Sequence, residues 1–254
     1  MPGIARLRLL SIVPLILAVA ASTAAPAEKD DWIDLTNLDS WRKPDMLWML
    51  ADSVAVDAEK PKLLSAKAGK SILVNGAKGR ARDLLSQRAF GDVEVHVEFL
   101  IPKGSNSGVK LQGLYEIQIL DSFGVKEPKG SDCGGIYPRA EFKPKYRYID
   151  KGVPPLVNAC KKPGEWQTLD IFFQAPRFDA DGKKTANARF VKVTFNGRVI
   201  HDNVEAATPT GHAWRRKESA KGPLLLQGDH CPGACRNVRV RPREIVREKE
   251  GTSK

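Results

Sequence analysis

The sequence predicts an all-β protein, built as an antiparallel β-sandwich of the jelly-roll kind. Many short segments alternate apolar and polar residues, turn formers separate them, and helix signals are nearly absent from the 254 residues. Without regular alternation of strands and helices, a parallel sheet is not expected. The chain is 42% hydrophobic and 28% charged, with no internal repeat or long linker, which indicates one main globular domain.

The first 27 residues are expected to form a signal peptide. Arg6 and Arg8 precede an apolar run over residues 9–21, and small residues suited to cleavage follow at 25–27. The run is short for a membrane-spanning helix, although an uncleaved anchor is the alternative. The sequence therefore predicts export, either to the periplasm or out of the cell.

The remaining chain is expected to form one domain over 28–243, followed by a basic tail over 244–254. No segment after the signal is apolar enough to span a bilayer, so no membrane contact is expected once it is removed. The net charge is +11, and about +9 without the two N-terminal arginines. No nucleic-acid-binding motif accompanies this charge, and a nucleic-acid partner is not expected.

The strands can be placed in chain order. They are expected at 93–100, 109–112, 115–120, 166–174, 190–195, 198–201, 224–227 and 238–240. Asn196-Gly197 predicts a type I′ hairpin turn between two of them. The last two strands are expected to form a closing pair. Residues 122–165 carry few strand signals and are rich in proline, so they predict a long ordered excursion that walls a binding site.

The strand over 115–122 is the first indication of function. Glu116 and Gln118 share one face, whereas Ile117 and Ile119 share the other. Because a buried carboxylate is costly unless it is paired or hydrogen-bonded, this face predicts a polar cleft for a ligand rich in hydroxyl groups. The alternative is a solvent-facing strand with one wet side.

Four cysteines follow the signal, and an even number in an exported chain is compatible with disulfides. Three pairings are possible, of which Cys133–Cys160 and Cys231–Cys235 are favoured because each pair brackets one loop-rich stretch. A zinc site at the Cys-x-x-x-Cys spacing lacks a second cysteine pair at suitable spacing. Free buried thiols remain an alternative.

An ordered series of motifs resembles the 3-keto-disaccharide hydrolase domain family. The motifs are Asn106-Ser107-Gly108, Tyr115 to Ser122, Gly134-Gly135-Ile136-Tyr137, Lys162 to Thr168, Ala175 to Asp179, Asn196-Gly197, His201-Asp202-Asn203, Pro209-Thr210-Gly211, Leu226 to His230 and Arg236 to Pro242. The resemblance covers roughly residues 32–243. It implies a concanavalin-A-like jelly roll, a fold shared with lectins and laminarinase-type glucanases, and cleavage of glycosides whose sugar is oxidised at C3.

Two features depart from related patterns. Cys231-Pro232-Gly233-Ala234-Cys235 stands where family members carry Gly and an apolar residue. Laminarinase-type enzymes carry Glu-x-Asp-x-x-Glu on the catalytic strand, whereas this strand has Glu116, Gln118 and Asp121 at that spacing. Without a bulge, Asp121 faces away from Glu116. Retaining hydrolysis needs carboxyl groups about 5 Å apart, so ordinary double displacement is disfavoured.

Cleavage of a keto sugar requires fewer catalytic groups than ordinary double displacement. A ketone at C3 makes the C2 proton acidic, so one base can remove it and the C1 substituent then leaves by elimination, with water adding afterwards. Glu116 is the first candidate for the base or acid, and His230 is the second. The candidate substrate-binding residues are Lys110, Gln118, Asp121, Tyr137 and Gln227, with Trp166 as a further residue that could stack on a sugar or belong to the core.

A divalent metal is possible but not required. Glu116, Asp121, Asp229 and His230 could supply ligands if their strands adjoin, and the metal could polarise the keto oxygen. The main alternative to the enzyme is a noncatalytic carbohydrate-binding module of the same fold, and a structural surface domain is a third hypothesis. A carbohydrate or keto-sugar partner is expected in the first two cases.

Overall fold

The computed structural model describes residues 31–76 and 78–244. The expected signal peptide and nearly all of the expected basic tail lie outside these residues. Within the described part, no helix is long and apolar enough to cross a membrane. One short 3-10 helix, η1 (Leu38–Ser40), is the only helix there, and almost all other regular structure is strand.

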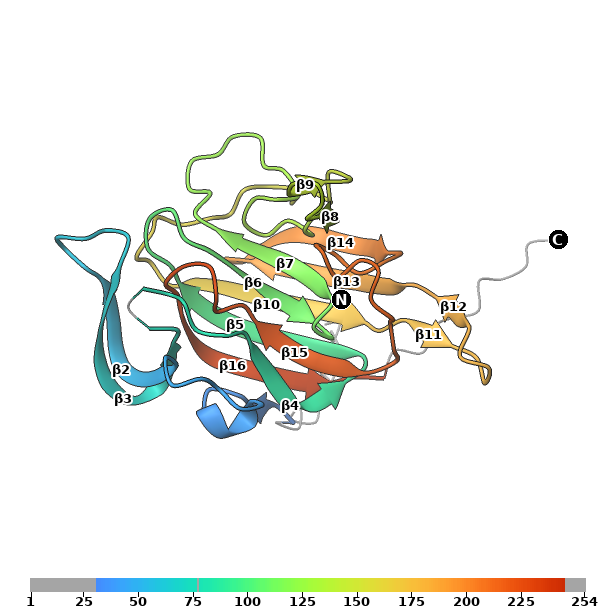
Figure 1. Ribbon diagram of the computed structural model, residues 1–254, viewed down its shortest axis with the longest axis horizontal. Coiled ribbons are helices and arrows are strands. Elements are labelled where there is room, and N and C mark those ends of the chain that lie inside the picture. The colour runs from blue at the N-terminus through green and yellow to red at the C-terminus, as the bar shows by residue number, and fades with distance from the viewer. Residues whose placement is uncertain (1–30, 77, 245–254) are drawn as a thin grey trace, which may run out of the picture. The chain divides into compact units, whose positions relative to one another are not determined.

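The larger of two main sheets has eight antiparallel strands. Their order is β14 (Arg198–Ala206), β13 (Ala188–Phe195), β10 (Gln167–Gln174), β5 (Val93–Leu100), β16 (Ala234–Pro242), β3 (Leu64–Val74) and β2 (Met49–Val56), with β1 (Ile33–Asp34) also paired to β16. The central strands β5 and β10 alternate buried and more exposed residues along most of their length, and every valine of β5 is buried. This sheet forms one layer of the sandwich (Figure 1).

The second layer is a four-stranded sheet that lies over the first (Figure 1). Its order is β4 (Leu84–Phe90), β15 (Gly222–Leu226), β6 (Asn106–Leu111) and β7 (Tyr115–Leu120). Two small hairpins stand outside the layers, formed by β8 (Ala140–Glu141) with β9 (Arg147–Tyr148) and by β11 (Arg177–Phe178) with β12 (Lys184–Ala186). The all-β antiparallel sandwich predicted from the sequence is confirmed.

Aromatic side chains join the two layers. Phe173 of β10 is fully buried, and its ring centroid lies 5.3 Å from that of Tyr115 on β7 and 5.4 Å from that of Phe190 on β13. Phe99 and Phe195 stack within the large sheet with centroids 5.9 Å apart. Because Tyr115 directly precedes Glu116, this packing holds the first residues of β7 against the core.

The expected strands are found, although β14 ends five residues later and β16 begins four residues earlier than predicted, and one expected pairing is wrong. Asn196 and Gly197 have φ angles of 48° and 77°, which confirms the type I′ turn between β13 and β14. The last two strands, β15 and β16, do not pair with each other. They lie in different sheets, because each places its apolar face in the interlayer core and completes its hydrogen bonds with strands far away in the sequence.

Strands β2, β3 and β4 were not predicted. The outer part of β3 reads Ser-Ala-Lys-Ala-Gly-Lys and is exposed, so it lacks the clear apolar alternation of a half-buried strand. The excursion over 122–165 does wall a pocket, as expected, through β8, β9 and the chain that precedes them. The register of β7 with β6 is regular from Asn106↔Leu120 to Leu111↔Tyr115, without a bulge.

Candidate carbohydrate site

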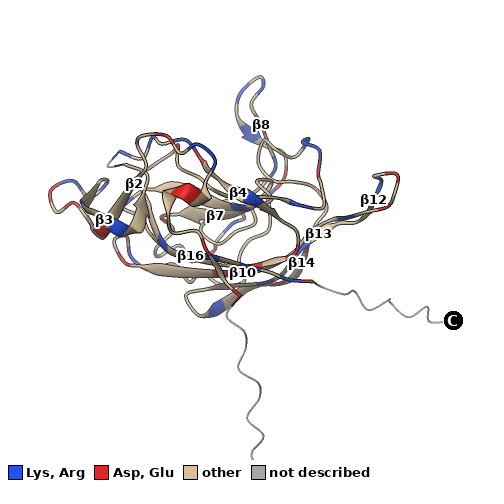
Figure 2. Ribbon diagram, turned by 90° about the horizontal axis from the view of Figure 1, so that it is seen from below, with Lys and Arg blue, Asp and Glu red and all other residues tan. Residues whose placement is uncertain are grey.

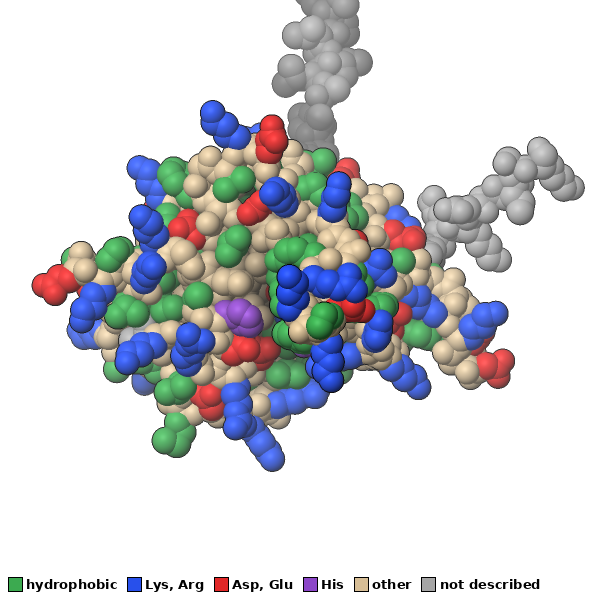
Figure 3. Space-filling model, turned by 45° about the horizontal axis from the view of Figure 1, so that its top comes forward, with side chains coloured by type: hydrophobic (Ala, Val, Ile, Leu, Met, Phe, Trp, Pro, Cys, Tyr) green, Lys and Arg blue, Asp and Glu red, His purple; other side chains and the backbone are tan. Residues whose placement is uncertain are grey.

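A pocket of about 630 Å³ opens beside the small sheet. This volume is within the range of small-molecule sites in proteins. Its lining residues come from β6, β7, the β8–β9 hairpin and two later loops: Asn106, Lys110, Glu116, Gln118, Tyr137, Phe142, Tyr146, Tyr148, Gly211, His212, Gln227, Asp229 and His230. Figure 3 shows a histidine beside acidic and apolar side chains on this face.

Glu116 and Lys110 form an ion pair at the base of the pocket. They are direct neighbours on β7 and β6, and Lys110 Nζ lies 3.2 Å from Glu116 Oε2. Glu116 is 3% exposed. Burial raises the pKa of the Glu116 carboxyl, and the Lys110 ammonium group opposes part of that rise. A carboxylate with a raised pKa beside a cation is suited to proton transfer.

The backbone around Glu116 leaves little freedom for its side chain. A Cβ atom at Gly108 on β6 would lie 2.3 Å from Glu116 Oε1, so only glycine allows this close approach of strand and carboxylate. The Glu116 N–H donates to Thr210 Oγ1 at 3.0 Å. The carboxylate is therefore held between β6 and the loop that carries Thr210.

The chain over 134–137 runs along the outer edge of β7. The Gly134 and Tyr137 N–H groups donate to the carbonyl oxygens of Gln118 and Glu116, at 2.8 and 3.1 Å, and Gln118 N–H donates to the Gly135 carbonyl at 2.9 Å. This segment protects an otherwise open strand edge and brings Tyr137 to the pocket. The Gly-Gly-Ile-Tyr motif thus lies directly beside the polar strand.

Gln118, the second polar residue of β7, also lines the pocket. Its Nε2 lies 3.3 Å from Oδ1 of Asn106, another lining residue, and donates to it. Glu116 and Gln118 therefore share one face, as predicted, while Ile117 and Ile119 are in the core. The face is buried by surrounding segments, which excludes the alternative of a solvent-facing strand.

His230 and Asp229 form a second pair in the pocket. The Asp229 carboxylate is hydrogen-bonded to His230 Nδ1, and both side chains are about half exposed. Such a bond orients the imidazole and leaves its Nε2 available for a ligand. A charged His230 also favours the ionised form of Glu116, so the two groups lie close enough to influence each other.

Gln227 precedes this pair and is fixed by the small sheet. Its N–H donates to the Gly108 carbonyl at 2.9 Å, and its carbonyl accepts from Ser107 Oγ at 2.8 Å. Gln227 thus extends the β15 pairing with β6 and reaches the pocket beyond the end of β15. Lys110, Glu116, Gln118, Tyr137, Gln227 and His230 therefore all line one pocket, whereas Asp121, the other residue named as a candidate, does not.

Three tyrosines form a hydroxyl cluster in the wall. The Tyr137 hydroxyl lies 2.9 Å from that of Tyr146 and 3.1 Å from that of Tyr148. Burial raises the pKa of Tyr137 and Tyr146, so both are neutral hydroxyls at neutral pH. Sequence reasoning missed Tyr146 and Tyr148; the only available signal was the Tyr-x-Tyr spacing within an excursion already expected to wall a site.

Asp83 was also missed. It precedes β4, accepts from the Gly228 N–H at 3.0 Å, and is influenced by the charges of Asp229, Lys110 and His230. Burial raises the pKa of the Asp83 carboxyl. No local sequence pattern marks this residue, because its relation to the site depends on the contact between the start of β4 and the loop after β15.

Two predicted candidates lie elsewhere. Asp121 follows the end of β7 and its carboxylate accepts from the Gly104 N–H at 2.8 Å. It does not line the pocket, because β7 has no bulge to turn it toward Glu116. Trp166 is half-buried against the outer part of the large sheet, where the Arg236 guanidinium lies 4.1 Å from its ring centroid.

Of the four residues named as possible metal ligands, Glu116, Asp229 and His230 line the pocket and Asp121 does not. Among residues 31–76 and 78–244, no three His, Cys, Asp or Glu side chains lie together in a way that could hold a metal ion. Glu116 faces the Lys110 ammonium group, and Asp121 lies outside the pocket. The side chains that line the described pocket therefore do not provide the combination of ligands that divalent metal ions usually bind in proteins.

All four cysteines are free thiols, so neither expected disulfide is present in the structure. Cys133 and Cys160 do adjoin: their side chains share a hydrogen bond, and burial raises the pKa of the Cys133 thiol. Cys235 packs against the core from β16, and burial raises its pKa to about 12. Cys231 lies in the preceding loop, with Sγ 4.0 Å from the Gly104 carbonyl.

A family model matches most of this chain. The model for the 3-keto-alpha-glucoside-1,2-lyase-like domain matches residues 31–241, which include both sheets and the whole pocket. The chain belongs to this family. Membership makes it a carbohydrate-active protein and confirms the resemblance noted from the motifs. A comparison with curated proteins finds no match.

Solved structures share the family's fold. Two proteins from Parabacteroides distasonis, each called a putative glycosyl hydrolase, are similar to this chain. One is 24% identical with a TM-score of 0.57 and covers 84% of each chain. The other is 18% identical with a TM-score of 0.54 and covers 84% of this chain and 99% of its own. These likenesses support the jelly-roll sandwich.

Proposed function

We propose that the protein is an exported enzyme that cleaves the glycosidic bond of 3-keto-glucosides by elimination at C1–C2. The observation that carries this proposal is the buried Glu116–Lys110 pair in a pocket that also holds the Asp229–His230 pair. Together they provide a base, a cation and an oriented imidazole, which is the set of groups that the reaction needs.

The reaction begins at C2. The Glu116 carboxylate takes the C2 proton, which the C3 ketone has made acidic, and the electron pair of the broken C–H bond forms an enolate. The Lys110 ammonium group stabilises the negative oxygen. The raised pKa of Glu116 makes it a stronger base than an exposed glutamate.

The bond to the leaving group then breaks. The enolate electrons form the C1=C2 double bond as the C1–O bond cleaves, and protonated His230 gives its proton to the departing oxygen. Asp229 stabilises the imidazolium before this transfer. Water can add to the unsaturated keto sugar afterwards, so that the net result equals hydrolysis. Gln118, Asn106 and Gln227 bind hydroxyl groups of the reacting sugar.

The substrate requirement is tested with a chromogenic 3-keto-α-glucoside beside its unoxidised parent. Turnover of the keto compound is expected, with no measurable turnover of the parent, because only the ketone acidifies C2–H. Each assay is repeated with a chelator. No loss of activity is expected, because the residues that line the pocket lack a suitable set of metal ligands. Turnover of both compounds would contradict the keto-assisted route, whereas saturable sugar binding without turnover would favour a noncatalytic binding module.

The charge on Lys110 predicts a shift in pH dependence. Lys110 lowers the pKa of Glu116 from the higher value that burial alone would produce. In a Lys110→Met variant that pKa rises, and since the base must be ionised, the acidic limb of the kcat/KM profile is expected to move to higher pH. A pH profile of both proteins measures this. Lys70→Met, on the exposed part of β3, serves as the control, and an unmoved acidic limb in Lys110→Met would remove Glu116 from the role of base.

A further inference from the structure

The wall of the pocket carries an unusual excess of positive charge. The segments 137–148 and 211–218 together contain seven Lys or Arg residues and two Glu residues, a net charge of +5 within a chain whose total is +11. The same two segments supply six pocket-lining residues: Tyr137, Phe142, Tyr146, Tyr148, Gly211 and His212. Figure 2 shows basic residues in the hairpin that β8 and β9 form, where Lys143 and Lys145 lie in the loop and Arg147 lies on β9.

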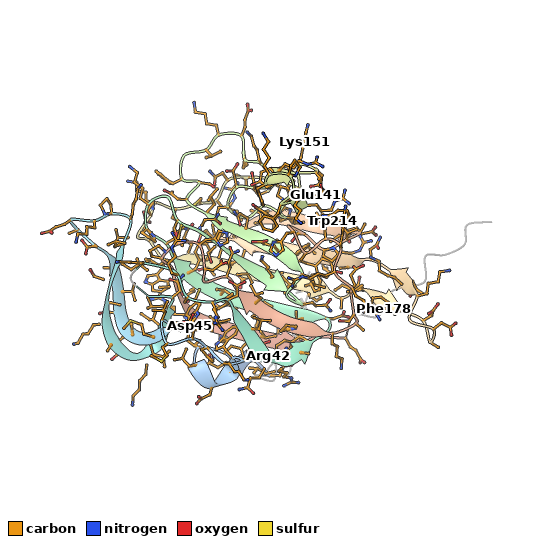
Figure 4. All side chains as sticks on the ribbon, in the orientation of Figure 1. Arg42, Asp45, Glu141, Lys151, Phe178 and Trp214 are labelled. Carbon is orange, nitrogen blue, oxygen red and sulfur yellow. The ribbon has the colours of Figure 1, made fainter. Side chains whose placement is uncertain are left out.

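Hydrogen bonds and an ion pair join the two segments into one unit. Ala140 N–H donates to the Gly211 carbonyl at 3.0 Å, and Gly211 N–H donates to the Pro138 carbonyl at 3.0 Å. Arg215 pairs with Glu141 at 3.0 Å, and its guanidinium lies 4.4 Å from the ring centroid of Trp214. Glu141 and Trp214 are labelled in Figure 4, above β7.

An aromatic surface leads outward from the pocket along this unit. The ring centroids of Phe142 and Tyr146 are 5.5 Å apart, those of Tyr146 and Tyr148 are 5.7 Å apart, and Phe142 lies 5.2 Å from His212. Phe142 is 61% exposed although it lines the pocket. Such a surface offers stacking to a ring that extends beyond the reacting sugar.

Cations without protein partners border this surface. Within the described parts of the chain, the side chains of Lys143, Lys145, Arg216 and Lys217 are exposed and form no hydrogen bond or ion pair with the protein. Lys143 and Lys145 lie between the lining residues Phe142 and Tyr146 in the hairpin tip. Arg216 follows Arg215, which pairs with Glu141 of the hairpin, and it comes four residues after the lining residue His212.

The base of the pocket has the opposite character. The buried Glu116 carboxylate pairs with Lys110 there, and the Asp229–His230 pair lines the same pocket, so two carboxylates face the position of the reacting sugar. A negatively charged ring would be repelled from these carboxylates but attracted to the wall. The charge distribution therefore orients a substrate, with its neutral keto sugar at the base and an anionic group at the wall.

We propose that the hairpin wall is a leaving-group subsite for a ring that bears a carboxylate, either a carboxylated phenol or a uronic acid. This rests on the proposed function for its assignment to the leaving group. The ring stacks on Phe142 and Tyr146, and the carboxylate lies among Lys143, Lys145 and Arg216.

Equilibrium binding tests the subsite without any turnover. The ligands are unoxidised 4-carboxyphenyl α-glucoside with its methyl ester, and a glucosyl-glucuronic acid with its methyl ester, measured by calorimetry on the full protein. At least one acid is expected to bind about 3- to 10-fold more tightly than its ester at low salt. The preference should fall below about 2-fold in 0.5 M salt, because exposed charges are screened. The acid that binds more tightly than its ester shows whether the ring is a carboxylated phenol or a uronic acid.

A matched pair of triple variants locates the effect. The wall variant combines Lys143→Gln, Lys145→Gln and Arg216→Gln, and it is expected to abolish the preference for the acid. A charge-reversal variant combines Lys143→Glu and Lys145→Glu, and it is expected to reverse that preference. Lys62→Gln with Lys67→Gln and Lys70→Gln removes the same charge from the β2–β3 region and should leave it intact. Equal binding of acids and esters, or a preference that survives in the wall variant, would overturn the proposal. A charge preference without turnover of any 3-keto-glucoside would instead count against the proposed reaction alone.

Discussion

Replacing Glu116 by glutamine is expected to reduce kcat/KM for a 3-keto-glucoside by about 10²- to 10⁴-fold, the usual contribution of a positioned general base. Glutamine has nearly the same shape but cannot accept the C2 proton. The loss should appear mainly in kcat, because Lys110, Gln118 and the aromatic wall remain to bind the sugar.

Two measurements make this result decisive. Calorimetric binding of the unoxidised glucoside should change by less than about 3-fold in Glu116→Gln, because a glutamine side chain keeps hydrogen-bonding capacity at that position. Glu127→Gln changes an exposed glutamate outside the pocket and should keep full activity. Retained turnover in Glu116→Gln would show that another group, with His230 as the first candidate, removes the proton.

Phe173→Ala is expected to destabilise the folded protein by about 3–5 kcal/mol, as for other large-to-small changes of buried phenylalanine. Phe173 is fully buried, and its ring contacts Tyr115 of the opposite sheet and Phe190 of its own. Removing the ring leaves a cavity between the layers that the regular strands on both sides cannot easily close.

Urea unfolding followed by circular dichroism measures this change through the midpoint and the slope. Phe123→Ala removes the same side chain from a position that is 49% exposed, and its effect should stay within about 0.5 kcal/mol. Similar midpoints for the two variants would mean that the interlayer packing of Phe173 contributes no more than a surface contact.

The core and the site are connected through β7. Tyr115 packs on Phe173, and the next residue, Glu116, faces the pocket. Alternation along one strand thus places a fully buried aromatic ring and a catalytic candidate on opposite faces. This pattern was readable in the sequence, since the apolar and polar residues of 115–119 alternate without interruption.

Other site residues could be predicted only with the family motifs. His230 was named as the second acid–base candidate and Gln227 as a binding residue, both within a motif of the family, and they line one pocket with Glu116. Tyr146, Tyr148 and Asp83 carry no such motif. Their positions depend on how the excursion over 122–165 and the start of β4 fold back on the small sheet, which local periodicity does not encode.

The sequence by itself determined the fold class, the inward and outward faces of strands such as 93–100 and 115–120, and the Asn196-Gly197 turn. These features depend on side-chain alternation and local backbone preference, which act over a few residues. The tertiary structure alone decided that β15 and β16 lie in different sheets, that Asp121 is outside the pocket, and that a basic aromatic hairpin walls it. Those outcomes depend on contacts between segments far apart in the chain, where burial of the shared core selects among many strand pairings that local patterns allow equally.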